Sequence, residues 1–435
     1  MVSPSQPPHG SHDGGSGQSA LPSFDAELRE AHAELGGAIQ AIQEIPGFET
    51  FLAPVRFADV AATADHPLVY LVPSERSGLA LVVRGDEIVD VPLPGLTDRR
   101  VHEWAERHRE NFPASRSVWS RHLAGLTNWL WDAMAGPLLG ALPAGSRITF
   151  IPAGHTGLLP LHAARTADAS RPSGHRYLID EVTPGYTPNA RALAAARVVA
   201  AETVPRRLLA VTDPEAALAA RLPHSRWEGQ AAAAAFPVSK ILVGADATID
   251  AVRAELREAD AVHFGCHGVA DSEPLQSAVR LAGGASLRLA DVLPLRLRLR
   301  LAVLSACDTF VPGRALPDEV INLPTGLLQA GVAGVVASMW AIDDHATALL
   351  MIEFYRRWDP ARDPAVALAE AQRWLRDATP AGVEEHWAAA LDAGERWLPE
   401  KVAEALLNGV FTAGDSGSRP WSEPALWAAF TFTGA

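Results

Sequence analysis

The stretch that decides the fold is Val262-His263-Phe264-Gly265-Cys266-His267-Gly268, and a second one follows in Leu301-Ala302-Val303-Leu304-Ser305-Ala306-Cys307-Asp308-Thr309. Each is an apolar run that stops at small or polar residues, which is typical of a buried strand followed by a turn. One run delivers a histidine and the other a cysteine. Parallel strands of an open α/β sheet end at the same edge, so we expect the two side chains to meet there.

A thiol beside an imidazole is a nucleophile beside its base. Cys307 stands where its strand gives way to a polar loop, whereas Cys266 is expected to be a buried small hydrophobic residue. His267, at the mouth of its strand, is a better base than His263, which we expect to be packed or hydrogen-bonded inside the strand. The pattern therefore favours a Cys–His dyad, with the N–H groups of Gly268 and Cys307 as oxyanion donors. Each residue taken alone also has a purely structural explanation.

The composition excludes several classes of protein. With 435 residues, 48% of them hydrophobic and 20% charged, the chain is a globular protein of one large domain or two. Its net charge of −14 argues against nucleic acid or an anionic membrane as a partner. Two cysteines are too few for a disulfide framework or a cysteine-based zinc site, and we expect no metal or other cofactor. Because we find neither a membrane-spanning run nor a secretion signal, we expect a cytoplasmic location.

The pattern along the chain predicts three regions. Residues 1–22 are rich in Ser, Gly and Pro and predict a disordered tail. Residues 23–144 combine helical patterns with three short strand patterns between 68 and 91, which favour an antiparallel meander. In residues 145–435, short β-branched runs alternate with helices, which predicts a mostly parallel sheet covered on both faces. Residues 426–433 favour a final strand.

Several ordered motifs carry a resemblance to a known family: His-Phe-Gly-Cys-His-Gly (263–268), Leu-Ser-Ala-Cys-Asp-Thr (304–309), Gly-Leu-Leu-Gln-Ala-Gly-Val (326–332) and Val-Ala-Ser-Met-Trp-Ala-Ile-Asp-Asp-His-Ala-Thr (336–347). Taken together they resemble the CHAT family of caspase-like and separase-like cysteine peptidases, in the clan that also holds metacaspases and gingipains. The resemblance covers about residues 145–435. It implies a caspase-type α/β sandwich with a degenerate first half before an active second half.

The resemblance also implies roles for individual residues. His267 takes the position of the general base and Cys307 that of the nucleophile. The pair Asp343-Asp344, just after Trp340, matches a position that forms the S1 wall in arginine-specific relatives, where a carboxylate would pair a substrate Arg in a bidentate manner. Capping of the helix that follows explains either aspartate equally well. Asp308 and Trp340 are further candidates for substrate binding.

These features predict a cysteine endopeptidase that acts on a protein or peptide substrate after a basic residue, with Arg favoured. Family members often carry helical repeats or a sensor domain, which we do not find here, so we expect a separate regulatory partner. Bacterial relatives act in defence and cell-death circuits. Arg314, in the loop after Cys307, is a candidate for self-processing. The alternative is a catalytically idle CHAT-fold scaffold; a nucleotide-binding protein is disfavoured because we find no phosphate-binding G-x-x-x-x-G-K-[ST] motif.

Overall fold

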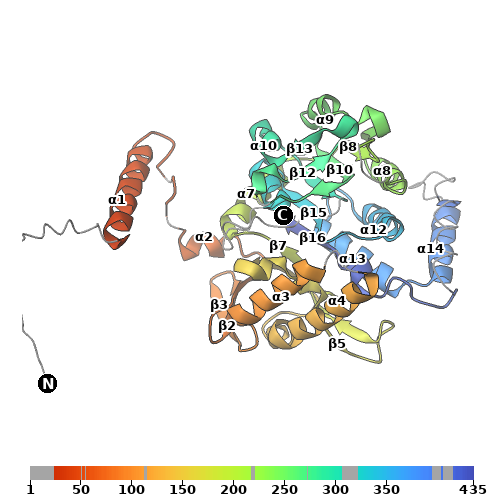
Figure 1. Ribbon diagram of the computed structural model, residues 1–435, viewed down its shortest axis with the longest axis horizontal. Helices are drawn as coiled ribbons and strands as arrows, with labels where there is room; N and C mark the ends of the chain where they lie inside the picture. The colour runs from red at the N-terminus through yellow and green to blue at the C-terminus, as the bar shows by residue number, and fades with distance from the viewer. Residues whose placement is uncertain are drawn as a thin grey trace, which may run out of the picture. The chain divides into compact units, whose positions relative to one another are not determined.

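The structure is a computed structural model that describes residues 24–49, 51–53, 55–111, 115–216, 221–271, 273–305, 322–393, 403–404 and 415–435. The tail expected over 1–22 lies outside these residues. The chain divides into two compact units, residues 1–56 and 57–435. In the first unit, the helix α1 spans Phe24–Gln43 (Figure 1). The second unit holds the sheet and the candidate site.

A large sheet forms the centre of the second unit, with eleven strands among the described residues. In spatial order they are β3 (Glu87–Leu93), β2 (Gly78–Arg84), β1 (Leu68–Val72), β4 (Arg147–Pro152), β7 (Thr183–Tyr186), β16 (Phe430–Gly434), β15 (Gly334–Ser338), β14 (Leu301–Leu304), β10 (Ala261–Gly265), β8 (Arg207–Thr212) and β9 (Val238–Val243).

The direction of the strands divides this sheet into two halves. Strands β15, β14, β10, β8 and β9 are parallel to one another. Strand β16 is antiparallel to β15 and parallel to β7, which is parallel to β4. The carboxyl ends of the two sets of parallel strands therefore lie at opposite edges of the sheet. The predicted α/β fold, with a mostly parallel sheet between helices, is confirmed.

The helices and the remaining strands surround the sheet. Those before β10 are α2 (Phe57–Ala61), α3 (Asp98–Asn111), α4 (Arg116–Leu130), a π-helical turn (Trp131–Ala135), α5 (Gly136–Leu139), β5 (Arg165–Ala167), β6 (His175–Tyr177), α6 (Leu178–Glu181), α7 (Ala190–Glu202), α8 (Ser225–Ala234) and α9 (Ile249–Leu256). Those after it are β11 (Gly268–Val269), β12 (Ala278–Arg280), β13 (Ser286–Arg288), α10 (Leu289–Val292), α11 (Leu323–Gln329), α12 (Asp344–Arg357), α13 (Pro364–Asp377), α14 (Pro380–Asp392) and α16 (Pro424–Trp427).

Side chains of alternate residues in each strand enter two different cores. In β8, Leu208 and Ala210 belong to one core, and Leu209 and Val211 belong to the other. This alternation follows from the two-residue period of a strand. Helices α8, α12 and α13 contribute to the first core and α9, α10 and α11 to the second, so helices cover both faces of the sheet (Figure 1).

The predicted meander is also confirmed, because β1 pairs antiparallel with β2 and β2 with β3. Strand β1 pairs in parallel with β4 as well, so the meander extends the main sheet. The expectation of a strand over 426–433 is partly wrong. Leu426 and Trp427 end the helix α16, which begins at Pro424, and the strand begins at Phe430. Proline is favoured in the first turn of a helix, and Pro424 accordingly begins α16 ahead of the strand.

Candidate active site

The two strands that carry the candidate chemistry are neighbours. Strand β10 pairs in parallel with β14, in a register that places Phe264 opposite Leu304. The residues that follow, Cys266 and Ser305, therefore start from the same edge of the sheet. The predicted adjacency of the two strand ends is confirmed. Cys307, Asp308 and Arg314 lie outside the described residues, so the dyad itself stays a prediction.

His267 and Gly268 connect the main sheet to a small one. His267 is half-buried, and its carbonyl oxygen accepts a hydrogen bond from the backbone N–H of Arg280 at 2.8 Å. Gly268 begins β11 and lies opposite Val279 of β12 in an antiparallel pair. Strand pairing on the carboxyl side of His267 therefore fixes the backbone at the end of β10.

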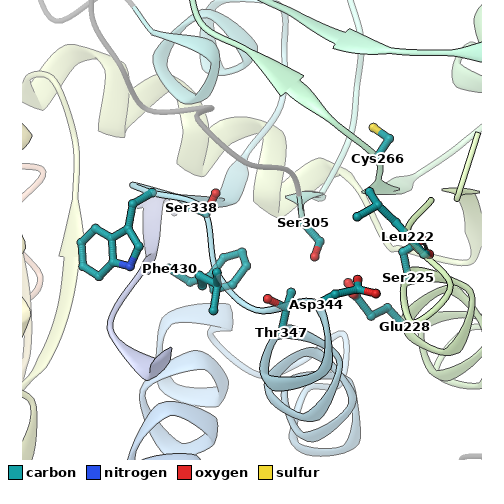
Figure 2. Close-up of a pocket in the computed structure, with 11 residues that line it drawn as sticks. Leu222, Ser225, Glu228, Cys266, Ser305, Ser338, Asp344, Thr347 and Phe430 are labelled. Atoms are coloured by element: carbon teal, nitrogen blue, oxygen red, sulfur yellow. Dashed lines mark hydrogen bonds between the residues drawn. The ribbon is translucent and has the colours of Figure 1, made fainter. Parts of the chain in front are cut away.

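A pocket lies at this edge of the sheet, beside the ends of β10, β14 and β15 (Figure 2). It is lined by Leu222, Ser225, Glu228, Cys266, Ser305, Ser338, Trp340, Ile342, Asp344, Thr347 and Phe430. The pocket wall contains leucine, isoleucine and aromatic side chains together with hydroxyl groups and two acidic side chains. The pocket wall therefore combines apolar side chains with polar and acidic ones.

The structure separates the two neighbouring aspartates. The carboxylate of Asp343 caps α12, accepting a hydrogen bond from the backbone N–H of Ala346 at 3.1 Å. Asp344 lines the pocket instead. Its carboxylate oxygen lies 2.7 Å from Nδ1 of His224 and accepts a second hydrogen bond from the His224 backbone N–H at 3.2 Å. Asp343 thus caps α12 and lines a second, neighbouring pocket, whereas Asp344 lines this one; whether either binds substrate stays a prediction.

Glu228 is a pocket residue that the sequence did not single out. It lies on α8, and its side chain is 1% exposed. Its Oε2 atom lies 3.4 Å from Nε2 of the buried His263. Burial raises the pKa of Glu228, and hydrogen bonding to His263 and to the Ser305 hydroxyl opposes that rise. The sequence did contain a sign of this burial. Ala231 and Ala232, three and four residues after Glu228, are also buried and place this acid on the apolar face of the helix.

The two side chains of β10 that were expected to be structural are buried. Nδ1 of His263 lies 3.1 Å from the hydroxyl oxygen of Tyr355, and the ring is fully buried. The expectation of a hydrogen-bonded histidine is confirmed. Cys266 is also fully buried, as expected, and its side chain lies in the core formed with α9, α10 and α11. It also contributes to the pocket wall.

Trp340, expected to contact substrate, is fully buried and lines the pocket. Its indole N–H donates to the carbonyl oxygen of Ala425 at 3.0 Å, which fixes the ring against α16. Among the residues that the structure describes, there is no cluster of three or more His, Cys, Asp or Glu side chains suited to hold a metal ion. None of the described helices is long and apolar enough to span a membrane.

Comparison with known proteins identifies the family. A model of the CHAT domain matches residues 125–435. The chain belongs to the CHAT domain family. Among curated protein sequences, none matches this chain.

The CHAT fold has neighbours among solved structures. A chain of the Saccharomyces cerevisiae separase–securin complex superposes with a TM-score of 0.55 at 9% identity, over 95% of this chain and 34% of that one. The CHAT chain thus spans about a third of the length of the separase chain it matches. The Arg-specific cysteine proteinase gingipain R superposes with a TM-score of 0.38 at 10% identity, over 78% of this chain and 74% of that one. The superposition with the separase chain shows that the two chains share a fold.

The contact between His224 and Asp344 predicts a pH-dependent contribution to stability. The hydrogen bond to Asp344 raises the pKa of His224 above its ordinary value of 6.5. A raised histidine pKa stabilises the fold at pH values below the unfolded pKa, and that contribution is lost as the pH rises through the folded pKa. His224→Gln is therefore expected to lower the free energy of unfolding more at pH 5.5 than at pH 8.5, measured by urea denaturation. An equal loss at both pH values would contradict this pairing.

Proposed function

We propose that this CHAT protein is a cysteine endopeptidase that cleaves a protein substrate after a basic residue, with Arg favoured. The observation that carries the proposal is the pocket at the ends of β10, β14 and β15, which contains two carboxylates, those of Glu228 and Asp344. It lies beside Ser305, two residues before the cysteine that the family resemblance makes the nucleophile. The caspase-like fold supports the same class of reaction.

In the proposed reaction, the His267 imidazole takes the proton of the Cys307 thiol, and the sulfur attacks the carbonyl carbon of the substrate. The oxyanion that forms accepts hydrogen bonds from the backbone N–H groups of Gly268 and Cys307. The imidazolium then donates its proton to the leaving amine, which breaks the peptide bond and leaves a thioester. Water, deprotonated by the same imidazole, hydrolyses the thioester and frees the thiol. The adjacency of β10 and β14 supports this pairing of residues.

The pocket supports a basic substrate residue for electrostatic reasons. Burial raises the pKa of Glu228, and a cation bound in the pocket would favour the ionised form of this acid and pair with it. Asp344, the first residue of α12, is half-buried and also lines this pocket. A guanidinium has a planar fork that can bond a carboxylate through two N–H groups, whereas an ammonium is a point charge, so Arg is favoured over Lys.

Regulation by a separate partner and a role in a bacterial defence or cell-death circuit are further proposals that rest on the family resemblance. The same holds for the proposed roles of Asp308 in substrate binding and of Arg314 in self-processing. Residues 145–435 are proposed as the peptidase portion, inside the matched range of 125–435.

A substrate library that varies only the residue before the cleaved bond tests the proposal. We expect the purified full chain to cleave Arg members fastest, Lys members more slowly, and Asp or apolar members at least about a hundredfold more slowly, because an acidic pocket attracts a cation, repels an anion and leaves its polar groups unpaired against an apolar side chain. The measurement is kcat/KM for fluorogenic peptides of otherwise identical sequence. Preference for Asp or an apolar residue at this position would show that the pocket assignment is wrong.

A further inference from the structure

A second pocket lies next to the first, and none of the steps of the proposed reaction takes place in it. It is formed by α4, by the loop between β15 and α12, and by α16. The residues that matter for its chemistry are Arg116, Trp119, Ala341, Ile342, Asp343 and Leu426. Arg116 and Trp119 precede the matched CHAT range, which begins at residue 125. This part of the wall therefore comes from outside the family domain.

The two pockets are neighbours that share one lining residue. Ile342 lines both of them. Trp340 of the first pocket contacts Trp119 of the second in an edge-to-face arrangement, with ring centroids 5.8 Å apart. The shared residue and the ring contact place the two pockets side by side, within reach of neighbouring residues of one extended peptide.

The wall supplied by α4 is held in place from two sides. The Ser120 hydroxyl donates to the Glu423 carboxylate at 2.6 Å, which ties α4 to the residue before α16. Trp119 is 7% exposed and also packs against His122 and His108. The pocket is therefore a pre-formed cavity between packed elements, as small-ligand sites commonly are.

The position of the second pocket relative to His267 identifies which part of a substrate it meets. His267, after β10, protonates the leaving amine in the proposed reaction, so residues that follow the cleaved bond lie on that side. The second pocket lies beyond β15, near α16 and α4, on the far side of the first pocket from β10. Residues that precede the cleaved bond therefore run towards it.

We propose that this second pocket binds the apolar side chain of a substrate residue that precedes the cleaved Arg. This inference rests on the proposed peptidase function and adds a second determinant of specificity. Trp119, Ile342 and Leu426 supply apolar walls. Arg116 and Asp343 carry opposite charges, and the Asp343 carboxylate is already engaged as the cap of α12. Arg116 is exposed, so water screens its charge, whereas an aliphatic side chain that fills the pocket is removed from water.

A peptide library with Arg fixed before the cleaved bond tests this inference, with each of the three preceding positions scanned through Gly, Asp, Lys, Leu and Phe. The full chain is expected to prefer Leu or Phe over Gly by about tenfold in kcat/KM at one of these positions, the usual gain for a filled apolar pocket. Ala341→Phe places a ring in the pocket and is expected to reduce that Leu-to-Gly ratio to near one.

Two further variants sharpen the test. Leu426→Ala enlarges the pocket and is expected to shift the preference from Leu towards Phe, so the inference stays testable if Ala341→Phe fails to fold. Val198→Phe adds the same ring at an exposed position of α7 and is expected to change no ratio. Cleavage after Arg without an upstream apolar preference, or a preference that Ala341→Phe and Leu426→Ala both leave unchanged, would overturn this inference alone. Failure to cleave any Arg peptide would overturn the proposed function, and this inference with it.

Discussion

Cys307→Ala is expected to abolish covalent labelling of the protein by an arginyl chloromethylketone and to lower kcat/KM for Arg peptides by at least about a thousandfold. The reason is that removal of the nucleophile eliminates the covalent route, and what remains is catalysis by binding and oxyanion stabilisation. Labelling is measured by the mass of the intact protein, and kcat/KM with a fluorogenic Arg substrate. His267→Ala is expected to cause a loss of the same order, because the two residues act as a unit.

The chain offers a matched control for this experiment, because it contains one other cysteine. Cys266 is fully buried at the end of β10, and its thiol belongs to the hydrophobic core. Cys266→Ala removes a thiol that lines the pocket but leaves the nucleophile in place, so it is expected to retain labelling at saturating reagent. If the label persists in Cys307→Ala and disappears in Cys266→Ala, the two cysteines have been assigned the wrong way round. If the natural chain is not labelled either, even when its activating partner is present, the alternative of an idle scaffold is supported.

The adjacency of the two strands could be predicted from sequence because it depends on backbone chemistry. Each run is mostly apolar, with His263 the one polar side chain of β10, as is typical of a strand covered on both faces. Such strands pair in parallel and end at one edge, which is what β10 and β14 do. The meander could be predicted for a similar reason, since its turn at Gly85-Asp86 separates two strand patterns at short range.

The composition of the pocket could not be predicted in the same way, because it depends on elements far apart in the sequence. Glu228 of α8 and Ser305 after β14 meet only because the sheet places β8, β10 and β14 side by side. The assignment of Asp343 and Asp344 depends on which residue starts α12. A shift of one residue would exchange cap and pocket wall, and local sequence does not decide helix ends to that accuracy.

The separate positions of the two aspartates lead to opposite expectations for their variants. Asp344→Asn keeps the size of the side chain and removes its charge, so it is expected to raise KM for Arg peptides by about a hundredfold, since a charged hydrogen-bond partner of the substrate is lost. Because this carboxylate binds the substrate and does not react, kcat is expected to change little. The selectivity for Arg over Gln before the cleaved bond should fall by a similar factor.

Asp343→Ala is the control that tests whether this effect belongs to the pocket. It removes the carboxylate that caps α12 and is expected to lower the free energy of unfolding by about 1 kcal/mol, as loss of a capping side chain usually does. The selectivity for Arg over Gln should not change, because Asp343 caps α12 and lines the second pocket but not the first. Urea denaturation and steady-state kinetics on both variants separate the two roles. If Asp343→Ala abolished the Arg selectivity and Asp344→Asn preserved it, the specificity carboxylate would be the residue that the structure places on the cap.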